Sequence, residues 1–238
     1  MNAYTSFYSV SPYGPCPYNG IREVRGENNV EFARNTLRRC GEIGTWALSV
    51  KGGTIHHNLL IDSCGGIDPN FAENILIENN VSFGWKAETS PKCYQAGGPL
   101  IGPAWSKDIV IRNNTLITDS AGVDVGIYLG DRELGPWETD AGFTFVASEK
   151  IDVRNNIVVS PAKAHFGTNL AEHAYQAAYN SYLNEGNELL DLENRFVAPY
   201  KNSRLQNSGD PAKEYNNKDS SLNTPGAFGG PQGTKWFE

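Results

Sequence analysis

The sequence predicts an all-β fold in which short parallel strands stack in repeated turns of the chain. Three observations predict it: an Asn that recurs after strand-like segments, alternation of apolar and polar residues before that Asn, and a composition rich in turn-forming residues. The 238 residues include 25 Gly, 13 Pro and a single Met. This composition is unlike that of a helical protein, so strands and turns should dominate.

The recurring Asn is the strongest signal in the chain. It occupies Asn35, Asn58, Asn80, Asn114 and Asn156, at intervals of 23, 22, 34 and 42 residues. Two intervals give a basic period, and the other two are that period with about 12 and about 20 inserted residues. A weaker sixth copy ends at Asn180, 24 residues further on.

A short alternating segment precedes each Asn. Apolar residues lie three and five positions before it, at Val30/Phe32, Ile75/Ile77, Ile109/Ile111 and Ile151/Val153, with Gly53/Ile55 in the second copy. The residues between them are mostly polar or charged. Such period-two alternation places one face inside and one outside. One copy cannot bury its apolar face alone, so the copies should stack into a continuous column.

Two further strands complete each copy. A first strand should precede the alternating one, at residues 46–50, 99–102, 126–130 and 143–146, and a third should follow the Asn. Three strands and three turns in about 22 residues describe one rung of a coil, with rungs about 4.8 Å apart. The Asn tolerates the left-handed backbone of a corner, and its amide can bond to the Asn of the next rung. The sequence therefore predicts a single-stranded right-handed parallel β-helix, a solenoid of about six rungs with an Asn ladder, two long loop insertions and an irregular C-terminal tail.

The chain divides into three segments. Residues 1–19, rich in Pro, Tyr and Gly, should cap the first rung, because bare strand edges invite aggregation. Residues 20–185 should form the β-helix domain. Residues 186–238 lose the Asn period and should form a tail packed on the helix. So few rungs also suit one part of a larger protein, and an oligomer is possible.

These rungs resemble the pectin-lyase-like right-handed β-helix superfamily over residues 20–184. The tail segments FVAPYKNSRLQNSGDPA and PGAFGG look like the closing segment of secreted bacterial carbohydrate-active members. The superfamily includes polysaccharide lyases, glycoside hydrolases, phage tailspikes, epimerases and adhesins, so the resemblance is more specific for fold than for activity. It implies a groove along the sheet of first strands, and an extracellular or periplasmic location. No catalytic signature can be carried over residue by residue.

Charge and hydropathy narrow the partners. Twenty basic and 27 acidic residues give a net charge of −7, which disfavours nucleic acid. No apolar run approaches the roughly 20 residues of a membrane helix, so no membrane partner is expected. No secretion signal is visible at the N-terminus, although one could have been removed.

Two insertions should wall the groove. Residues 84–98 would follow a third strand, and residues 131–141 lie between two first-strand segments. Loops of this length usually carry function, although they could also pad the helix or form an oligomer contact.

Aromatic residues in and beside the insertions suit a polysaccharide, because sugar rings present apolar C–H faces to aromatic planes. The expected substrate-binding residues are Trp85, Tyr94, Trp105, Tyr128 and Trp137. Each could instead cover a loop base as part of a satellite core.

Charged residues near the same face are the catalytic candidates, namely Asp68, Lys86, Glu88, Asp131, Arg132, Glu133 and His165. Glycoside hydrolysis needs two carboxyl groups. A lyase needs a base for the proton beside a uronate carboxyl, and a cation such as Lys, Arg or Ca²⁺ to neutralise that carboxylate. The sequence identifies no cofactor with certainty, and Ca²⁺ is a possible cofactor. Asp68 also suits a turn, since Asp-Pro is a turn pair, and most surface carboxylates only keep a protein soluble.

The histidines separate into different roles. His165 falls where a first strand of the last rung should run, which makes it the best histidine candidate for a general acid or base. His56 and His57 are adjacent in a strand, so they should point to opposite faces and cannot share a metal. His56 belongs to an outward column with Glu78, Arg112 and Arg154 that is typical of a solvated charge ladder, and His57 sits at a corner.

Three functional hypotheses stay open. The first is a polysaccharide-degrading enzyme, a lyase or a hydrolase, which requires titratable side chains that converge on one groove position. The second is a non-catalytic carbohydrate-binding module, with aromatic residues but no such pair. The third is a structural or tailspike-like β-helix, which requires a large symmetric interface.

Overall fold

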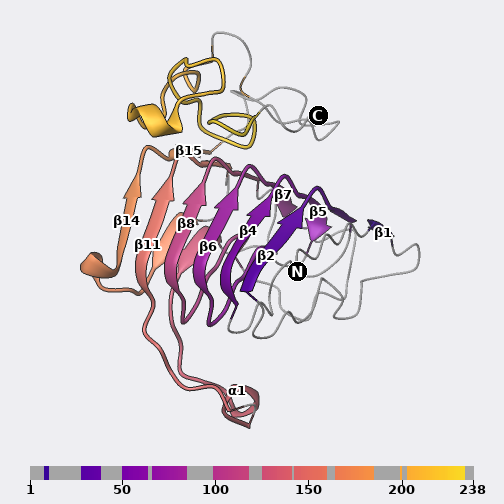
Figure 1. Ribbon diagram of the computed structural model, residues 1–238, viewed down its shortest axis with the longest axis vertical. Helices are drawn as coiled ribbons and strands as arrows, with labels where there is room; N and C mark the ends of the chain where they lie inside the picture. Colours follow the sequence, from indigo (N-terminus) through magenta and orange to yellow (C-terminus); the bar gives the residue numbers. More distant parts are fainter. Residues whose placement is uncertain are drawn as a thin grey trace.

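A computed structural model (Figure 1) describes residues 8–10, 28–38, 50–63, 66–84, 99–117, 125–140, 142–159, 164–184, 199 and 203–233. This part of the chain is all-β, and its strands pair in parallel. Its helices are one short α-helix and two single 3₁₀ turns, namely α1 (Pro136–Asp140), η1 (Glu172–Ala174) and η2 (Lys213–Tyr215). The predicted all-β class with parallel strands is confirmed.

Two large parallel sheets contain most of the strands. The long-strand sheet has six, in the order β14-β11-β8-β6-β4-β2. They are β2 (Asn28–Ala33), β4 (Lys51–His56), β6 (Glu73–Glu78), β8 (Lys107–Arg112), β11 (Glu149–Arg154) and β14 (Tyr175–Ala178). The short-strand sheet has seven. They are β1 (Tyr8–Val10), β3 (Thr36–Arg38), β5 (Leu59–Ser63), β7 (Val81–Gly84), β9 (Thr115–Ile117), β12 (Ile157–Val159) and β15 (Ser181–Leu183).

A third, shorter set of parallel pairings lies between these sheets in chain order. It contains β10 (Val125–Leu129) and β13 (Ala164–Thr168), which pair with each other. Single bridges join Ile67 to Ile101 and Ile101 to Ile127. We call this set the third face. It contains the predicted first-strand positions 99–102 and 126–130, as well as the segment that begins at Ile67.

Consecutive strands belong to different sheets, whereas neighbours within a sheet come from successive repeats. After β4, for example, the chain enters β5 in the short-strand sheet, passes Ile67 on the third face, and returns to the long-strand sheet as β6. The alternating apolar residues point between the sheets, and Ile75, Ile77 and Ile109 are each at most 3% exposed. They join one core cluster with residues of the third face, such as Ile101.

The Asn ladder is confirmed and includes the sixth copy. Each backbone N–H donates to the Oδ1 of the next Asn at 2.9–3.0 Å, from Asn35 through Asn58, Asn80, Asn114 and Asn156 to Asn180. Each Nδ2 donates to the same oxygen at 2.9–3.0 Å. The four central amides are completely buried.

The left-handed backbone belongs to the residue before each ladder Asn, not to the ladder Asn as expected. These corner residues have φ between 51° and 61° and are Arg34, His57, Asn79, Asn113, Asn155 and Tyr179. The ladder Asn is therefore selected for its amide, whereas the residue before it makes the turn. We call these six residues the corner column.

The C-terminal segment 203–233 packs on the corner column, beyond the C-terminal ends of the long strands (Figure 1). Asn79 Nδ2 donates to the carbonyls of Ala227 and Gly229 at 2.8 and 2.9 Å. Asn155 Oδ1 accepts the N–H of Asp210 at 2.7 Å. The tail is thus bonded to several successive repeats.

The predicted first strand at 143–146 is wrong. This segment is irregular, and Phe145 and Val146 are 55% and 48% exposed. Its alternation resembles a strand, but an isolated segment needs a paired neighbour to become one. The insertion after β10 therefore continues to β11, and Figure 1 shows it reaching away from the sheets with α1 at its far end. We call residues 130–148 the arm.

Candidate functional site

The third face carries one row of residues that point away from the core. Ile67, Ile101 and Ile127 are in register and completely buried. Because successive residues of a strand alternate in direction, the residues that follow them should turn outward. That row contains Asp68, Gly102 and Tyr128, and its next member is Gly167, which pairs with Tyr128.

Glycine leaves space for the two side chains of this row. A Cβ on Gly102 would lie 2.3 Å from Cγ of Pro99 and 3.4 Å from Oδ1 of Asp68, and one on Gly167 would lie 3.1 Å from Cδ2 of Tyr128. The Pro99 ring therefore occupies the space over Gly102 beside the Asp68 carboxylate, and the phenol ring of Tyr128 lies over Gly167. Both side chains are partly exposed. Two predicted site residues, Asp68 and Tyr128, thus share one shallow surface row.

Asp131, one of the predicted catalytic residues, holds the base of the arm with both of its carboxylate oxygens. Its Oδ1 accepts the Trp105 N–H at 2.7 Å and the Ser148 hydroxyl at 2.6 Å, and its Oδ2 accepts the Ser148 N–H at 2.7 Å. Asn169 adds a reciprocal pair, because it accepts from Asp131 N and donates to Asp131 O. The carboxylate joins both ends of the arm to the neighbouring repeats.

The prediction that Trp105 stacks on a sugar ring is wrong, because this side chain is buried. It is 3% exposed, and its Nε1 donates to the Arg132 carbonyl at 2.9 Å. Phe71 stacks on it at 4.7 Å, Phe143 stacks on Phe71 at 4.6 Å, and the Arg132 guanidinium lies 4.8 Å from the Trp105 ring. The alternative of a satellite core under a loop base is therefore right for Trp105. Arg132 contributes a cation–π contact to that core.

Of the remaining described candidates, Glu133 adjoins this cluster and His165 lies apart from it. Glu133 is exposed on the arm, and its carbonyl accepts from Arg132 Nη1. His165 is in β13, as expected of a first strand, and its Nε2 donates to the Leu183 carbonyl at 2.8 Å. Its ring lies 5.7 Å from that of Tyr182. These contacts direct His165 toward the end of the short-strand sheet.

Four predicted site residues lie outside the described residues, namely Trp85, Lys86, Glu88 and Tyr94. Of Trp137 only the backbone, in α1, is described. Their roles stay predictions.

The charged side chains on the outer face of the long-strand sheet are more buried than the sequence indicates. His56, Glu78, Arg112 and Arg154 do form one column in register. The expectation of a solvated ladder is wrong, however. Glu78 is 7% exposed, and its Oε2 accepts from Arg112 Nε at 2.9 Å and Nη2 at 2.8 Å.

The tail covers the end of this column at Arg154. Arg154 Nη1 donates to Asp210 at 2.6 Å, and Tyr215 places its ring 4.8 Å from the Arg154 guanidinium. Burial lowers the pKa of Arg154, but the hydrogen bond and charge of Asp152, with Asp210 and Tyr215, outweigh it and raise the pKa above its ordinary value. Asp210 and Tyr215 are more than 50 residues from Arg154 in sequence, so no local signal could have found this contact.

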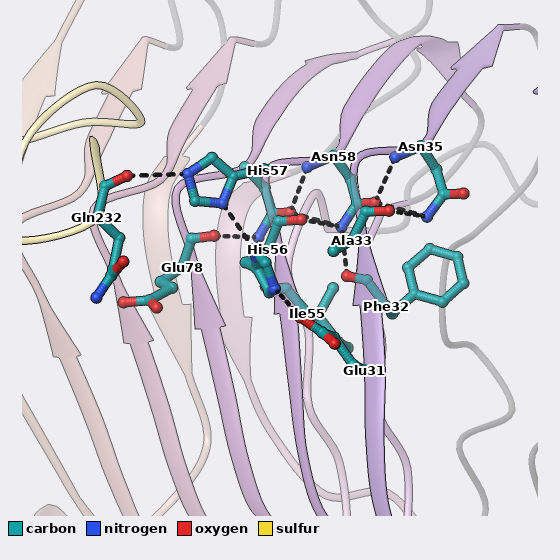
Figure 2. A network of polar contacts seen from close by, with 11 residues as sticks. Glu31, Phe32, Ala33, Asn35, Ile55, His56, His57, Asn58, Glu78 and Gln232 are labelled. Carbon is teal, nitrogen blue, oxygen red and sulfur yellow. Dashed lines mark hydrogen bonds and ion pairs between the residues drawn. The ribbon is translucent and has the colours of Figure 1, made fainter. Parts of the chain in front are cut away.

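His56 and His57 are in contact, although they were expected to point to opposite faces. Their Nδ1 atoms are 2.7 Å apart, and the rings meet edge to face at 4.9 Å (Figure 2). The reason is the left-handed backbone of His57, with φ of 54°, which ends the alternation of the strand. Figure 2 shows this pair between Glu31 and the tail residue Gln232.

Comparisons with protein-family models, with curated proteins and with solved structures found no match. No group of three or more His, Cys, Asp or Glu side chains in the described ranges is placed to hold a metal ion. None of the helices within the same residues is long and apolar enough to cross a membrane. The functional argument therefore rests on geometry.

Proposed function

We propose that the chain is a right-handed parallel β-helix of the pectin-lyase-like type, and that it binds a polysaccharide along the third face outside the cell. The strand order supports this, because each sheet gains one parallel strand per repeat. Parallel crossover connections are almost always right-handed. In this arrangement the third face is the sheet of first strands.

The row of Asp68 and Tyr128 carries the proposal. A partly exposed phenol ring offers an apolar face to the C–H surface of a sugar, and a carboxylate accepts hydrogen bonds from sugar hydroxyls. Gly167 carries no side chain beside the Tyr128 ring, so that a sugar ring can approach the phenol. The row crosses successive strands, and a long polymer could therefore contact several repeats at once.

Cleavage of the bound polymer is a second candidate. Asp68 favours it, because a carboxylate on the binding row could serve as the acid or base of a hydrolase or as the base of a lyase. Lys86 and Glu88 are the predicted partners from the insertion that follows β7.

The test is a binding panel of neutral and uronate-containing polysaccharides, followed by affinity gel electrophoresis. Replacing Tyr128 by Ala should weaken binding by about fivefold to tenfold, the size of one aromatic stacking contact. The matched control is Tyr182→Ala, which removes a phenol that is 42% exposed on β15. Binding that Tyr128→Ala leaves unchanged would place the polymer elsewhere.

Product analysis separates binding from catalysis. Unsaturated products that absorb in the ultraviolet identify a lyase, and new reducing ends alone identify a hydrolase. Asp68→Asn should then abolish product formation while it preserves most of the binding. If no polymer is cleaved and several are bound, the non-catalytic function stands.

A further inference from the structure

We propose that Glu31, His56 and His57 form a proton-operated latch for the end of the tail, closed at mildly acidic pH and open at alkaline pH. The three side chains make a continuous hydrogen-bonded chain from β2 to the Gln232 carbonyl (Figure 2). This proposal does not depend on the polysaccharide.

The contacts leave little freedom in the direction of each bond. Glu31 Oε1 lies 2.9 Å from His56 Nε2, the two Nδ1 atoms lie 2.7 Å apart, and His57 Nε2 lies 3.0 Å from Gln232 O. A carbonyl oxygen only accepts, so His57 Nε2 carries a proton. An ionised carboxylate also only accepts, so His56 Nε2 carries one too.

Counting protons gives the charge of the pair. The Nδ1 atoms also need a proton between them, because without one their lone pairs would face each other at 2.7 Å. The two rings therefore hold three protons, whereas two neutral imidazoles hold two. The pair carries one positive charge, opposite the negative charge of Glu31.

The surroundings of the His56–His57 pair are compatible with a positive charge that is gained at low pH and lost at high pH. The His56 side chain is 15% exposed and His57 is 2% exposed, whereas Glu31 is at the surface with 39% of its side chain exposed. From β6, Glu78 lies beside His56 but is already bonded to Arg112. Arg34 occupies the same corner in the preceding repeat and is exposed. Gln232, from the tail, is neutral.

Loss of the third proton must break one bond of the chain. The rings either separate, or one of them moves its proton to Nδ1 and gives up Glu31 or Gln232. The latched form thus binds one proton more than a released form with neutral histidines, so a rise in pH favours release.

Only the end of the tail should respond. The earlier tail residues are held by corner amides, as when Asn79 donates to Ala227 and Gly229, and amides do not titrate. The corner position is therefore occupied by Asn where the contact is permanent and by His where it depends on pH.

Hydrogen exchange of the whole chain tests the latch at about pH 5.5 and about pH 8.5, either side of the ordinary histidine value. After correction for intrinsic exchange, protection of Gly230–Gly233 should fall by at least about tenfold at the higher pH, as expected for loss of a charge-assisted bond. Protection of residues 205–229 should not change. Nitrogen-15 spectra of the imidazoles should show three ring protons on the pair at the lower pH.

Two variants separate the proton from the contact. In Glu31→Gln the amide can donate to His56 Nε2, so the chain is complete with two ring protons and should stay closed at both pH values. His57→Asn places at this corner the residue found at Asn79 and Asn113, and its Nδ2 should hold Gln232 at both pH values. Equal protection of Gly230–Gly233 in the wild type at the two pH values would overturn the latch. So would a Glu31→Gln variant that opens like the wild type.

Discussion

Two corners of the molecule contain the same kind of hydrogen bond, from a backbone N–H to a side-chain oxygen of the next repeat, but they continue it differently. At the Asn corner, each backbone N–H donates to the Oδ1 of the next repeat through six residues from Asn35 to Asn180. At the corner where the third face meets the long-strand sheet, Ala72 N–H donates to Ser106 Oγ and Ser106 N–H to Ser148 Oγ. That second column then ends on Asp131, which accepts the Ser148 N–H.

The difference follows from the side chains. An Asn amide accepts and donates at once, so identical residues can continue without limit. The Ser106 hydroxyl instead donates its one proton to backbone carbonyls, those of Ala104 nearby and Pro69 in the preceding repeat. Asp131 only accepts, and it comes from the arm. A column of identical residues builds the scaffold, whereas the mixed column admits an insertion and lies next to the proposed binding row.

The largest expected effect is at the centre of the Asn ladder. Asn114→Ala removes the acceptor for two donors of Asn80 and the donor to Asn156, all completely buried, and should cost about 3 to 5 kcal/mol. Asn35→Ala leaves the Asn58 oxygen with the backbone N–H of residue 35 as its donor and should cost about 1 to 2 kcal/mol. Urea unfolding of both variants measures the contrast, and equal losses would mean that the column is not cooperative.

Asp131→Ala should follow, with a loss of about 2 to 3 kcal/mol, because the N–H groups of Trp105 and Ser148 lose their acceptor. The arm should also become sensitive to proteolysis, since both of its ends are freed. Glu133→Ala, on the exposed part of the arm, is the control and should melt like the wild type. If proteolysis of the arm is unchanged in Asp131→Ala, the aromatic stack alone fixes it.

A smaller effect is expected at Ser106. Ser106→Ala leaves the Ala72 N–H without its acceptor and should cost about 1 to 2 kcal/mol in thermal or urea unfolding. Ser82→Ala is a matched control, because Ser82 is also fully buried but its Oγ has no partner among the described residues. That variant should be neutral or slightly stabilising. A larger loss in Ser82→Ala than in Ser106→Ala would contradict the role of the Ser column.

The smallest effect belongs to the exposed charges beside the Ser column, where Lys107 and Glu149 pair at 2.5 Å. The hydrogen bond between them lowers the pKa of Glu149 and raises that of Lys107. The pair's contribution should be lost as pH falls below the carboxyl range near 4.3, and again as it rises above the lysine range near 10.4. Unfolding of Lys107→Met across pH, at low and high salt, should show a difference that salt removes.

The sequence was informative wherever the repeat is regular. Spacing alone located all six ladder Asn residues and the inward Ile columns, because a repeated contact leaves a repeated residue. It failed where one contact occurs once. Asp131 was chosen as a catalytic candidate because nothing in the sequence around it indicates that the N–H groups of Ser148 and Trp105 donate to its carboxylate. The contact of His56 with His57 depends on one left-handed corner, and the tail partners of Asn79 lie about 150 positions away.

The tail that crosses the corner column also changes how the molecule should unfold. A stack in which each strand pairs only with its neighbours can unfold from its ends, one repeat at a time. Here a single segment is bonded to His57, Asn79, Asn113 and Asn155, which belong to four successive repeats. Detaching Asn79, Asn113 or Asn155 strains the other two, so these three repeats should melt as one thermodynamic unit, and the repeat of His57 should join them only while its contact with Gln232 is closed.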